Sequence, residues 1–167
     1  MKLVVDVQYS ENSALTGGIL FDSWSSPVAS QRLLSQESNI QEYEPGKFYK
    51  RELPCIIGLI KKHKLNPEII IIDGYVFLDG EVEAGLGKYL YDALNNNIPI
   101  IGVAKKPFKD ISSKYQIYRG KSEKPLYVTA IGIDTEKAKE RIQSMHGKNR
   151  IPTLLKNADQ LCRNIAF

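Results

Sequence analysis

The sequence of 167 residues contains little cysteine. Only Cys55 and Cys162 occur, with no CxxC pair and no Cys/His cluster, so a disulfide framework and a zinc ribbon are excluded. We interpret both thiols as packing residues and expect a reducing compartment, the cytoplasm. A domain of this length buries about two-thirds of the surface of its unfolded chain, so its core does not need such crosslinks.

Long apolar runs are also absent from the sequence. None approaches the roughly 18 residues that span a bilayer, and Met1 leads directly into a strand-like segment rather than into a signal peptide. Repeats, low-complexity tracts and linker-like stretches are missing too. We therefore expect a single soluble domain over residues 1–167 that does not bind membranes, and a monomer, because no apolar pattern exceeds what a core requires.

What the sequence does contain is an uneven distribution of charge. Residues 1–60 carry 5 basic and 7 acidic groups, whereas residues 61–167 carry 18 basic and 12 acidic groups. The segment 104–124 alone holds seven cations and two acids. This pattern predicts an anion-binding surface, although a solvated lysine-rich face would look the same. The seven cations are Lys105, Lys106, Lys109, Lys114, Arg119, Lys121 and Lys124.

Hydrophobic periodicity predicts an α/β fold, with strands first and then alternating helices and strands. We expect Pro54 to be the first residue of a helix, a position that suits proline. The apolar runs 68–73 and 99–104, with a helical pattern between them, predict a β-α-β unit. The full set of predicted strands is 3–9, 14–24, 31–38, 68–73, 99–104, 115–118 and 126–131, and the predicted helices are 54–64, 86–94, 134–147 and 153–164.

Three carboxylates occupy positions that suggest chemistry. Asp6 lies within an apolar strand, where a charge is costly unless it is paired. Asp73 ends the most apolar strand, at the edge where open α/β sheets bind ligands. Glu52 lies at the positive end of the predicted helix. Each also has an ordinary explanation, as an exposed strand acid, an Asp-Gly turn and a helix-start acid respectively.

Together, these three carboxylates would form an oxygen-ligand set suited to Mg²⁺. This ion prefers carboxylates and completes its coordination shell with water and substrate phosphate oxygens. Spacing along the chain does not show whether the three side chains converge. The sequence therefore predicts a candidate magnesium site whose assembly depends on the fold.

Short motifs also occur in series along nearly the whole chain. They are Val5-Asp6-Val7, Tyr43-Glu44-Pro45-Gly46, Arg51-Glu52-Leu53-Pro54, Asp73-Gly74, Gly85-Leu86, Gly102 to Lys106, Lys124 to Val128, and Arg150 to Asp159. In this order they resemble the endonuclease V family of deoxyinosine-directed nucleases. The resemblance implies an RNase H-like α/β fold with a central mixed β-sheet flanked by helices.

The resemblance also implies roles for individual residues. Asp6, Glu52 and Asp73 match the metal-binding carboxylates, and Asp159 matches a variable fourth polar group on the last helix. Lys105 matches a lysine that faces the scissile phosphate. The implied cofactor is Mg²⁺, for which we expect Mn²⁺ to substitute.

The implied partner is a nucleic acid, DNA or RNA, that contains a deaminated base. The resemblance places Tyr43 in a wedge beside the flipped base, and it places Pro45, Gly46 and Gly74 at or near the base pocket. Cations of the basic segment would grip the backbone independently of base sequence; those we assign are Lys106, Lys109, Arg119 and Lys121.

The sequence departs from the family pattern in three places. The family commonly has a Gly and a His-Pro pair soon after Asp-Gly, where this chain has Tyr75 to Glu81. Glu42 and Glu44 add negative charge to the wedge, and Pro-Glu-Pro-Thr near the carboxyl end is reduced to Ile-Pro-Thr. Neither histidine matches a catalytic position of the family.

The sequence thus predicts a Mg²⁺-dependent endonuclease that cuts on the 3′ side of deoxyinosine or another deaminated base, in DNA repair. The altered segment after Gly74 keeps a second hypothesis open, a nucleic-acid-binding relative with weak or no cleavage. A third hypothesis is a plain α/β domain whose carboxylates are turn and cap residues.

Overall fold

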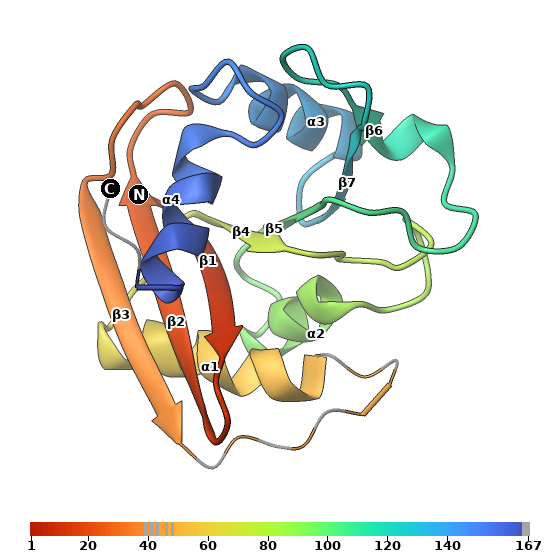
Figure 1. Ribbon diagram of the computed structural model, residues 1–167. Coiled ribbons are helices and arrows are strands. Elements are labelled where there is room, and N and C mark those ends of the chain that lie inside the picture. The colour runs from red at the N-terminus through yellow and green to blue at the C-terminus, as the bar shows by residue number, and fades with distance from the viewer. Residues whose placement is uncertain (39, 41, 43, 46, 48, 165–167) are drawn as a thin grey trace.

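The computed structural model describes the chain from residue 1 to 164 except for positions 39, 41, 43, 46 and 48. Within this part, seven strands form one sheet in the order β3-β2-β1-β4-β5-β7-β6 (Figure 1). The strands are β1 (Lys2–Tyr9), β2 (Ser13–Phe21), β3 (Gln31–Ser38), β4 (Ile69–Asp73), β5 (Ile100–Ala104), β6 (Gln116–Ile117) and β7 (Leu126–Ile131).

The centre of the sheet is parallel and its two sides are antiparallel. Strands β1, β2 and β3 form an antiparallel meander, while β4 runs parallel to β1 and β5 runs parallel to β4. Strands β7 and β6 complete the other side in antiparallel fashion. The four isoleucines of β4 are all buried, as expected for a strand covered on both faces.

Helices cover both faces of this sheet. They are α1 (Tyr49–Lys62), α2 (Leu86–Ala93), α3 (Thr135–Ser144) and α4 (Thr153–Cys162). Side chains of α1 and α2 join Leu3, Val5 and Ile72 in one core, whereas those of α3 and α4 join Val4 and Ile71 in the other. The strand residues thus alternate between two cores. In the described part of the chain, no helix is both long enough and apolar enough to cross a bilayer.

The structure confirms the predicted fold class, the β-α-β unit formed by β4, α2 and β5, and the third strand over residues 31–38. Several boundaries differ by a few residues. The second strand ends at Phe21 rather than at Trp24, and α3 ends at Ser144 rather than near Gly147.

The predicted start of the first helix is wrong. Helix α1 begins at Tyr49, so Pro54 lies inside it. Proline removes one helical hydrogen bond, but Tyr49 and Leu53 both pack against the core beneath α1. This burial favours extension of the helix beyond the proline and moves Glu52 into the first turn.

The predicted strand over residues 115–118 is also shorter than expected. Ser113–Tyr115 forms a 3-10 helix (η1), and only Gln116 and Ile117 pair with β7. The Tyr115 ring is buried against Gly80, where a Cβ atom would lie 2.1 Å from the ring. Packing against the loop after β4 therefore replaces strand pairing at Tyr115.

Candidate active site

Three of the predicted site residues lie where the parallel strands end. The register pairs Val5 with Ile72, so β1 continues past β4 and places Asp6 beside the position of Asp73. Lys105 follows the last residue of β5, and its Nζ lies 3.5 Å from Oδ2 of Asp73. Because parallel strands end at the same edge of the sheet, these side chains converge although they are far apart in sequence.

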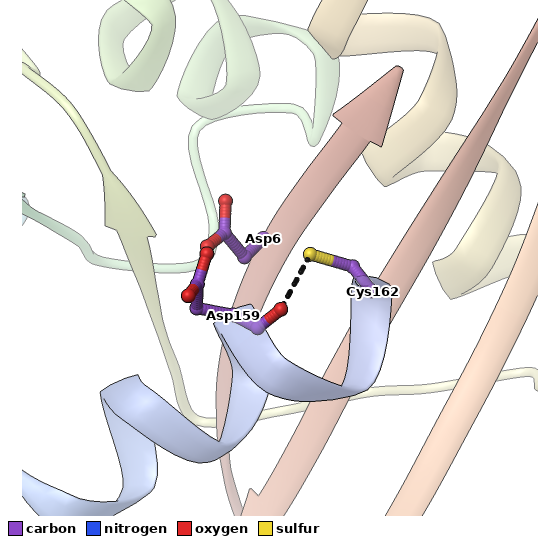
Figure 2. A group of neighbouring side chains, drawn as sticks. All are labelled: Asp6, Asp159 and Cys162. Atoms are coloured by element: carbon purple, nitrogen blue, oxygen red, sulfur yellow. Dashed lines mark hydrogen bonds between the residues drawn. The ribbon is translucent and has the colours of Figure 1, made fainter. Parts of the chain in front are cut away.

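Helix α4 brings Asp159 to the same edge. It packs over β1 and β2, and Gly17 of β2 is paired with Asp6. A Cβ atom on Gly17 would lie only 3.0 Å from the backbone oxygen of Ala158, so the close approach of α4 requires glycine here. Figure 2 shows the result, with the Asp6 and Asp159 carboxylates beside each other.

Glu52 approaches this group from the first turn of α1. Burial raises the pKa of Glu52 to about 8, and the negative charges of Asp6 and Asp73 add to the effect. Burial, followed by the charge of Asp73, raises the pKa of Asp6 to about 7, although the Val7 N–H and Lys105 oppose the shift. Nε of Arg163 also lies 2.8 Å from Oδ1 of Asp159. The ionised carboxylates thus raise the pKa values of their neighbours, and a bound positive ion would relieve this repulsion.

The donor set suits a hard divalent cation. Ligand atoms of Asp6, Asp159 and Cys162 lie within 4.8 Å of one another (Figure 2). Burial raises the pKa of Cys162 to about 12, so its thiol stays protonated and donates to the backbone oxygen of Asp159 at 3.2 Å. Two oxygen donors, from Asp6 and Asp159, therefore remain in this group, and they are of the kind that hard divalent cations prefer. Glu52 and Asp73 of the predicted ligand set are not part of this group.

Two cavities meet at Asp73. The first, which we call the α4 cavity, has a volume of about 400 Å³ and is bordered by Asp6, Asp73, Lys105 and Asp159. The second, the aromatic cavity, has a volume of about 570 Å³. Its lining includes Tyr49, Glu52, Asp73, Gly74, Tyr75 and Phe108. Both volumes fall in the range of small-molecule sites.

The segment that departs from the family pattern builds one wall of the aromatic cavity. The Tyr75 hydroxyl donates to the backbone oxygen of Lys106 at 2.6 Å and accepts from the Phe108 N–H at 3.1 Å. Farther on, Oδ1 of Asp79 accepts three backbone N–H groups, from residues 81, 82 and 83, at 2.8 to 3.0 Å. The altered segment is thus fixed by its own hydrogen bonds and also fixes the chain after β5.

Gly74 lies at the junction between this segment and β4. Its φ of +135° is a conformation that side chains disfavour, and its N–H donates to the backbone oxygen of Val103 at 3.0 Å. No heavy atom lies within 4 Å of the position that a Cβ would take. Glycine here therefore serves the backbone turn and leaves open space beside Asp73.

The predicted backbone-binding cations are placed differently from one another. Lys106 and Lys109 are exposed at the rim of the aromatic cavity. Lys121 is exposed in the connection between β6 and β7. These two strands lie beyond β5 at one edge of the sheet, and the role of Lys121 stays a prediction. Pro45 is exposed ahead of α1, while Tyr43 and Gly46 lie outside the described residues.

The assignment of Arg119 to nucleic-acid binding is wrong. Its side chain is 4% exposed, and its guanidinium donates to the backbone oxygens of Met145, Gly147, Asn149 and Arg150 at 2.6 to 3.3 Å. Burial also lowers its pKa. Arg119 therefore holds the loop between α3 and α4 in place and has no surface to offer to a phosphate.

The negative charge of Glu44, in the segment that the sequence predicts to form a wedge, is partly balanced. Nζ atoms of Lys47 and Lys50 lie 3.6 and 3.5 Å from Oε2 of Glu44. Such exposed pairs contribute little to stability, but they reduce the repulsion that Glu44 would exert on a phosphate.

Sequence reasoning missed two residues that shape the site. Tyr75 was recognised only as a departure, and Arg150 only as part of a motif. Arg150 borders the α4 cavity and donates to three backbone oxygens. Its one sequence signal is its place just before the helix that carries Asp159.

A mixed sheet of this order, with helices on both faces, is an RNase H-like α/β fold. The carboxylates at the ends of its parallel strands are the residue types that a metal-dependent nuclease uses. Residues 3–123 match the family model described as Endonuclease V. The chain belongs to the endonuclease V family.

Known proteins similar to this chain agree. Endonuclease V from Streptomyces avermitilis is 26% identical over 182 residues, which cover 95% of this chain and 77% of that protein. The crystal structure of Bacillus subtilis endonuclease V has a TM-score of 0.82 at 21% identity and covers 98% of this chain and 79% of its own. Ciona intestinalis endonuclease V, crystallised with a 24mer DNA containing an inosine followed by a ribo-adenosine, has a TM-score of 0.77 at 20% identity, with 98% and 84% covered.

Proposed function

We propose that this protein is a Mg²⁺-dependent endonuclease that hydrolyses the phosphodiester bond on the 3′ side of deoxyinosine or another deaminated base, as a step in DNA repair. The proposal is supported by the position of Asp6 beside Asp73 at the ends of neighbouring parallel strands, with Nζ of Lys105 3.5 Å from Oδ2 of Asp73. Glu52 lies close enough for the charges of Asp6 and Asp73 to raise its pKa. The inosine-containing DNA bound to the Ciona relative supports the choice of substrate.

Asp6, Glu52 and Asp73 would hold the metal, and Asp159 would supply a fourth oxygen. When bound, the ion neutralises charge on the phosphate and lowers the pKa of an attacking water. Burial is the largest cause of the raised pKa values of Asp6 and Glu52, and both carboxylates would have to be ionised to hold the ion. Lys105 adds a positive charge at the edge where the phosphate would lie.

The aromatic cavity is the proposed site for the extruded base. It borders Asp73, so a base inside it would lie next to the phosphate at the carboxylates. Tyr75 and Phe108 offer ring surfaces, and Gly74 leaves the entrance without a side chain. Extrusion costs least for a mismatched or damaged base, which gives a physical origin for preference for such bases.

The exposed lysines Lys106 and Lys109 at the rim of this cavity would contact backbone phosphates. Such contacts are independent of sequence and release counterions, so binding would weaken steeply with added salt. Selectivity would then come from the cavity and affinity from the lysines.

The test is cleavage of an end-labelled strand with one deoxyinosine, in Mg²⁺, with matched DNA and RNA versions. We expect one nick on the 3′ side of the inosine, lost in Asp73→Ala. Asp134→Ala is the matched control, because Asp134 caps α3 away from the site. Absence of a nick, or a nick that survives Asp73→Ala, would refute the proposal. Tight binding without turnover in Mg²⁺ or Mn²⁺ would instead favour the nucleic-acid-binding relative.

A further inference from the structure

The position of Lys105 is not fixed by the sheet. Pairing between β5 and β7 ends at Ala104 and Tyr127, so the carbonyl of Lys105 lies beyond the ladder. Its side chain is 41% exposed, and the two residues that follow are also exposed. A lysine in such a place has considerable rotamer freedom. The Tyr75 hydroxyl holds the backbone of Lys106 and Phe108, but a further contact is needed at Lys105 itself if the amine is to stay beside Asp73.

Arg150 supplies that contact. Its Nε donates to the backbone oxygen of Lys124 at 3.1 Å, and one terminal nitrogen donates to the backbone oxygens of Pro125, at 2.8 Å, and of Lys105. These acceptors come from the ends of two neighbouring strands. The planar guanidinium can bridge them, whereas the single ammonium of lysine cannot match the same spread.

The contacts of Arg150 are those of a residue that holds backbone segments together, because they are made to carbonyl oxygens and not to a carboxylate. Among the residues that the structure describes, no carboxylate lies within 4.0 Å of its guanidinium nitrogens. Its hydrogen-bond partners are neutral backbone carbonyls, so the described contacts of the guanidinium hold the backbone and do not balance a negative charge. Both side chains border the α4 cavity together with the carboxylates.

The loop that carries Arg150 is itself held by a second arginine. Buried Arg119 donates to four backbone oxygens between residues 145 and 150, including that of Arg150 itself. The same loop leads into α4, which presents Asp159. One restrained loop thus connects two parts of the site, Lys105 after β5 and Asp159 on α4.

We propose that Arg150 is a positioning residue that fixes Lys105 for catalysis, by tying the backbone of Lys105 to the start of β7 and to the loop before α4. This inference rests on the proposed function. It predicts that loss of Arg150 lowers the rate of the chemical step through Lys105 and leaves nucleic-acid affinity nearly unchanged.

The experiment measures single-turnover cleavage of the deoxyinosine strand by the full chain. In Arg150→Ala we expect the rate constant to fall about 10- to 100-fold, as for a misplaced catalytic group, with the Kd for the strand changed less than about threefold. Arg150→Lys should not restore the rate, but low concentrations of guanidinium chloride, far below those that unfold the protein, should partly rescue Arg150→Ala. The control Arg141→Ala removes another half-buried arginine, which lies over Trp24, and should cleave normally.

A double-mutant cycle decides whether Arg150 acts through Lys105. Arg150→Ala should slow the wild-type protein but not the Lys105→Ala variant. An equal loss in both backgrounds, or a loss found entirely in Kd, would overturn the inference and make Arg150 an independent structural or phosphate-binding residue.

Hydrogen exchange of the segment 105–111 provides a test without substrate. In this segment the Phe108 N–H donates to the Tyr75 hydroxyl. If Arg150 holds the start of the segment at Lys105, this N–H should exchange faster in Arg150→Ala and Arg150→Lys than in wild type. Unchanged exchange refutes the tether. If the wild-type protein does not cleave while exchange responds as expected, the proposed function fails and the tether stands.

Discussion

Gly17 of β2 lies opposite Asp6 of β1, and its missing side chain gives α4 the room to approach the sheet. Gly17→Ala places a Cβ 3.0 Å from two backbone atoms of α4, at Ala158 and Cys162. We expect a loss of about 1–3 kcal/mol in the free energy of unfolding, typical of overpacking. Metal affinity should also fall, because Asp159 moves with α4. Calorimetric titration with Mg²⁺ measures the second effect.

Gly18→Ala is the matched control for that variant. Its Cβ would meet the Leu59 side chain of α1, at 2.7 Å, on the opposite face of the sheet. It should destabilise the protein with a smaller loss of metal affinity, because the clash is with the end of the flexible Leu59 side chain, which lies two turns of α1 away from Glu52. Equal losses of metal affinity in the two variants would contradict the link between Gly17 and Asp159.

Metal binding should release protons at neutral pH. The pKa of Asp6 is raised to about 7 and that of Glu52 to about 8, so both carry protons part of the time at pH 7 without metal. Since a ligand carboxylate must be ionised, the heat of Mg²⁺ binding should depend on the ionisation enthalpy of the buffer. Glu52→Gln should reduce this dependence, and identical heats in phosphate and Tris would speak against the raised pKa values.

The metal-free protein should lose stability as the pH rises. The ordinary pKa values of Asp6 and Glu52 are 3.8 and 4.5, and the values in the folded protein are higher. At a pH between the ordinary and the raised value of each group, the native state therefore binds more protons than the unfolded chain. The contribution is complete below about pH 4 and is lost as the pH rises through about 7 to 8. Melting temperatures in EDTA should therefore fall from pH 5 to pH 9. Saturating Mg²⁺ should reverse much of the loss, and a flat profile in EDTA would contradict the account.

Tyr75→Phe tests the wall of the aromatic cavity. It removes the hydroxyl that bonds to the backbone of Lys106 and Phe108. We expect a loss of about 1 kcal/mol in stability and slower cleavage, because the chain after Lys105 loosens. Tyr118→Phe is the control, since that exposed hydroxyl bonds only to the nearby Gln116 among the described residues. Normal cleavage by Tyr75→Phe would show that the loop needs no such support.

Arg119→Ala should affect folding rather than nucleic-acid binding. The variant leaves four backbone oxygens without their donor, which we expect to cost about 2–4 kcal/mol of the free energy of unfolding. The salt dependence of binding should stay as in wild type, whereas Lys106→Ala should lower its slope by about one ion. Denaturant unfolding and binding across a salt series separate the two effects.

Much of the fold could be predicted from the sequence because the strongest signals are local. The isoleucine run of β4 is buried on both faces. A continuous apolar run predicts such a strand without any knowledge of the residues that pack against it. The start of α1 could not be predicted in this way, because it depends on the packing of Tyr49 and Leu53 against residues elsewhere in the chain. The shortened β6 has the same origin, in the contact between Tyr115 and Gly80.

The same distinction between local signals and contacts with distant residues applies to the site. Asp6 can be singled out from the sequence because a charge within an apolar strand is costly, and Asp73 because it ends a strand at the edge where open α/β sheets bind ligands. Arg119 was misplaced because a count of charges cannot tell a buried guanidinium from an exposed one. Arg150 was missed because its partners are backbone oxygens, which leave no trace in residue identity.

Asp73 borders both cavities, and this has a consequence for the distance between the bound base and the cut in the proposed reaction. If a base enters on one side of β4 and the backbone is cut on the other, the offset between lesion and nick is set by the end of a rigid strand. The geometry of the site would then determine that offset. Every base that the aromatic cavity accepts should yield a nick at the same distance from it, whatever the surrounding sequence.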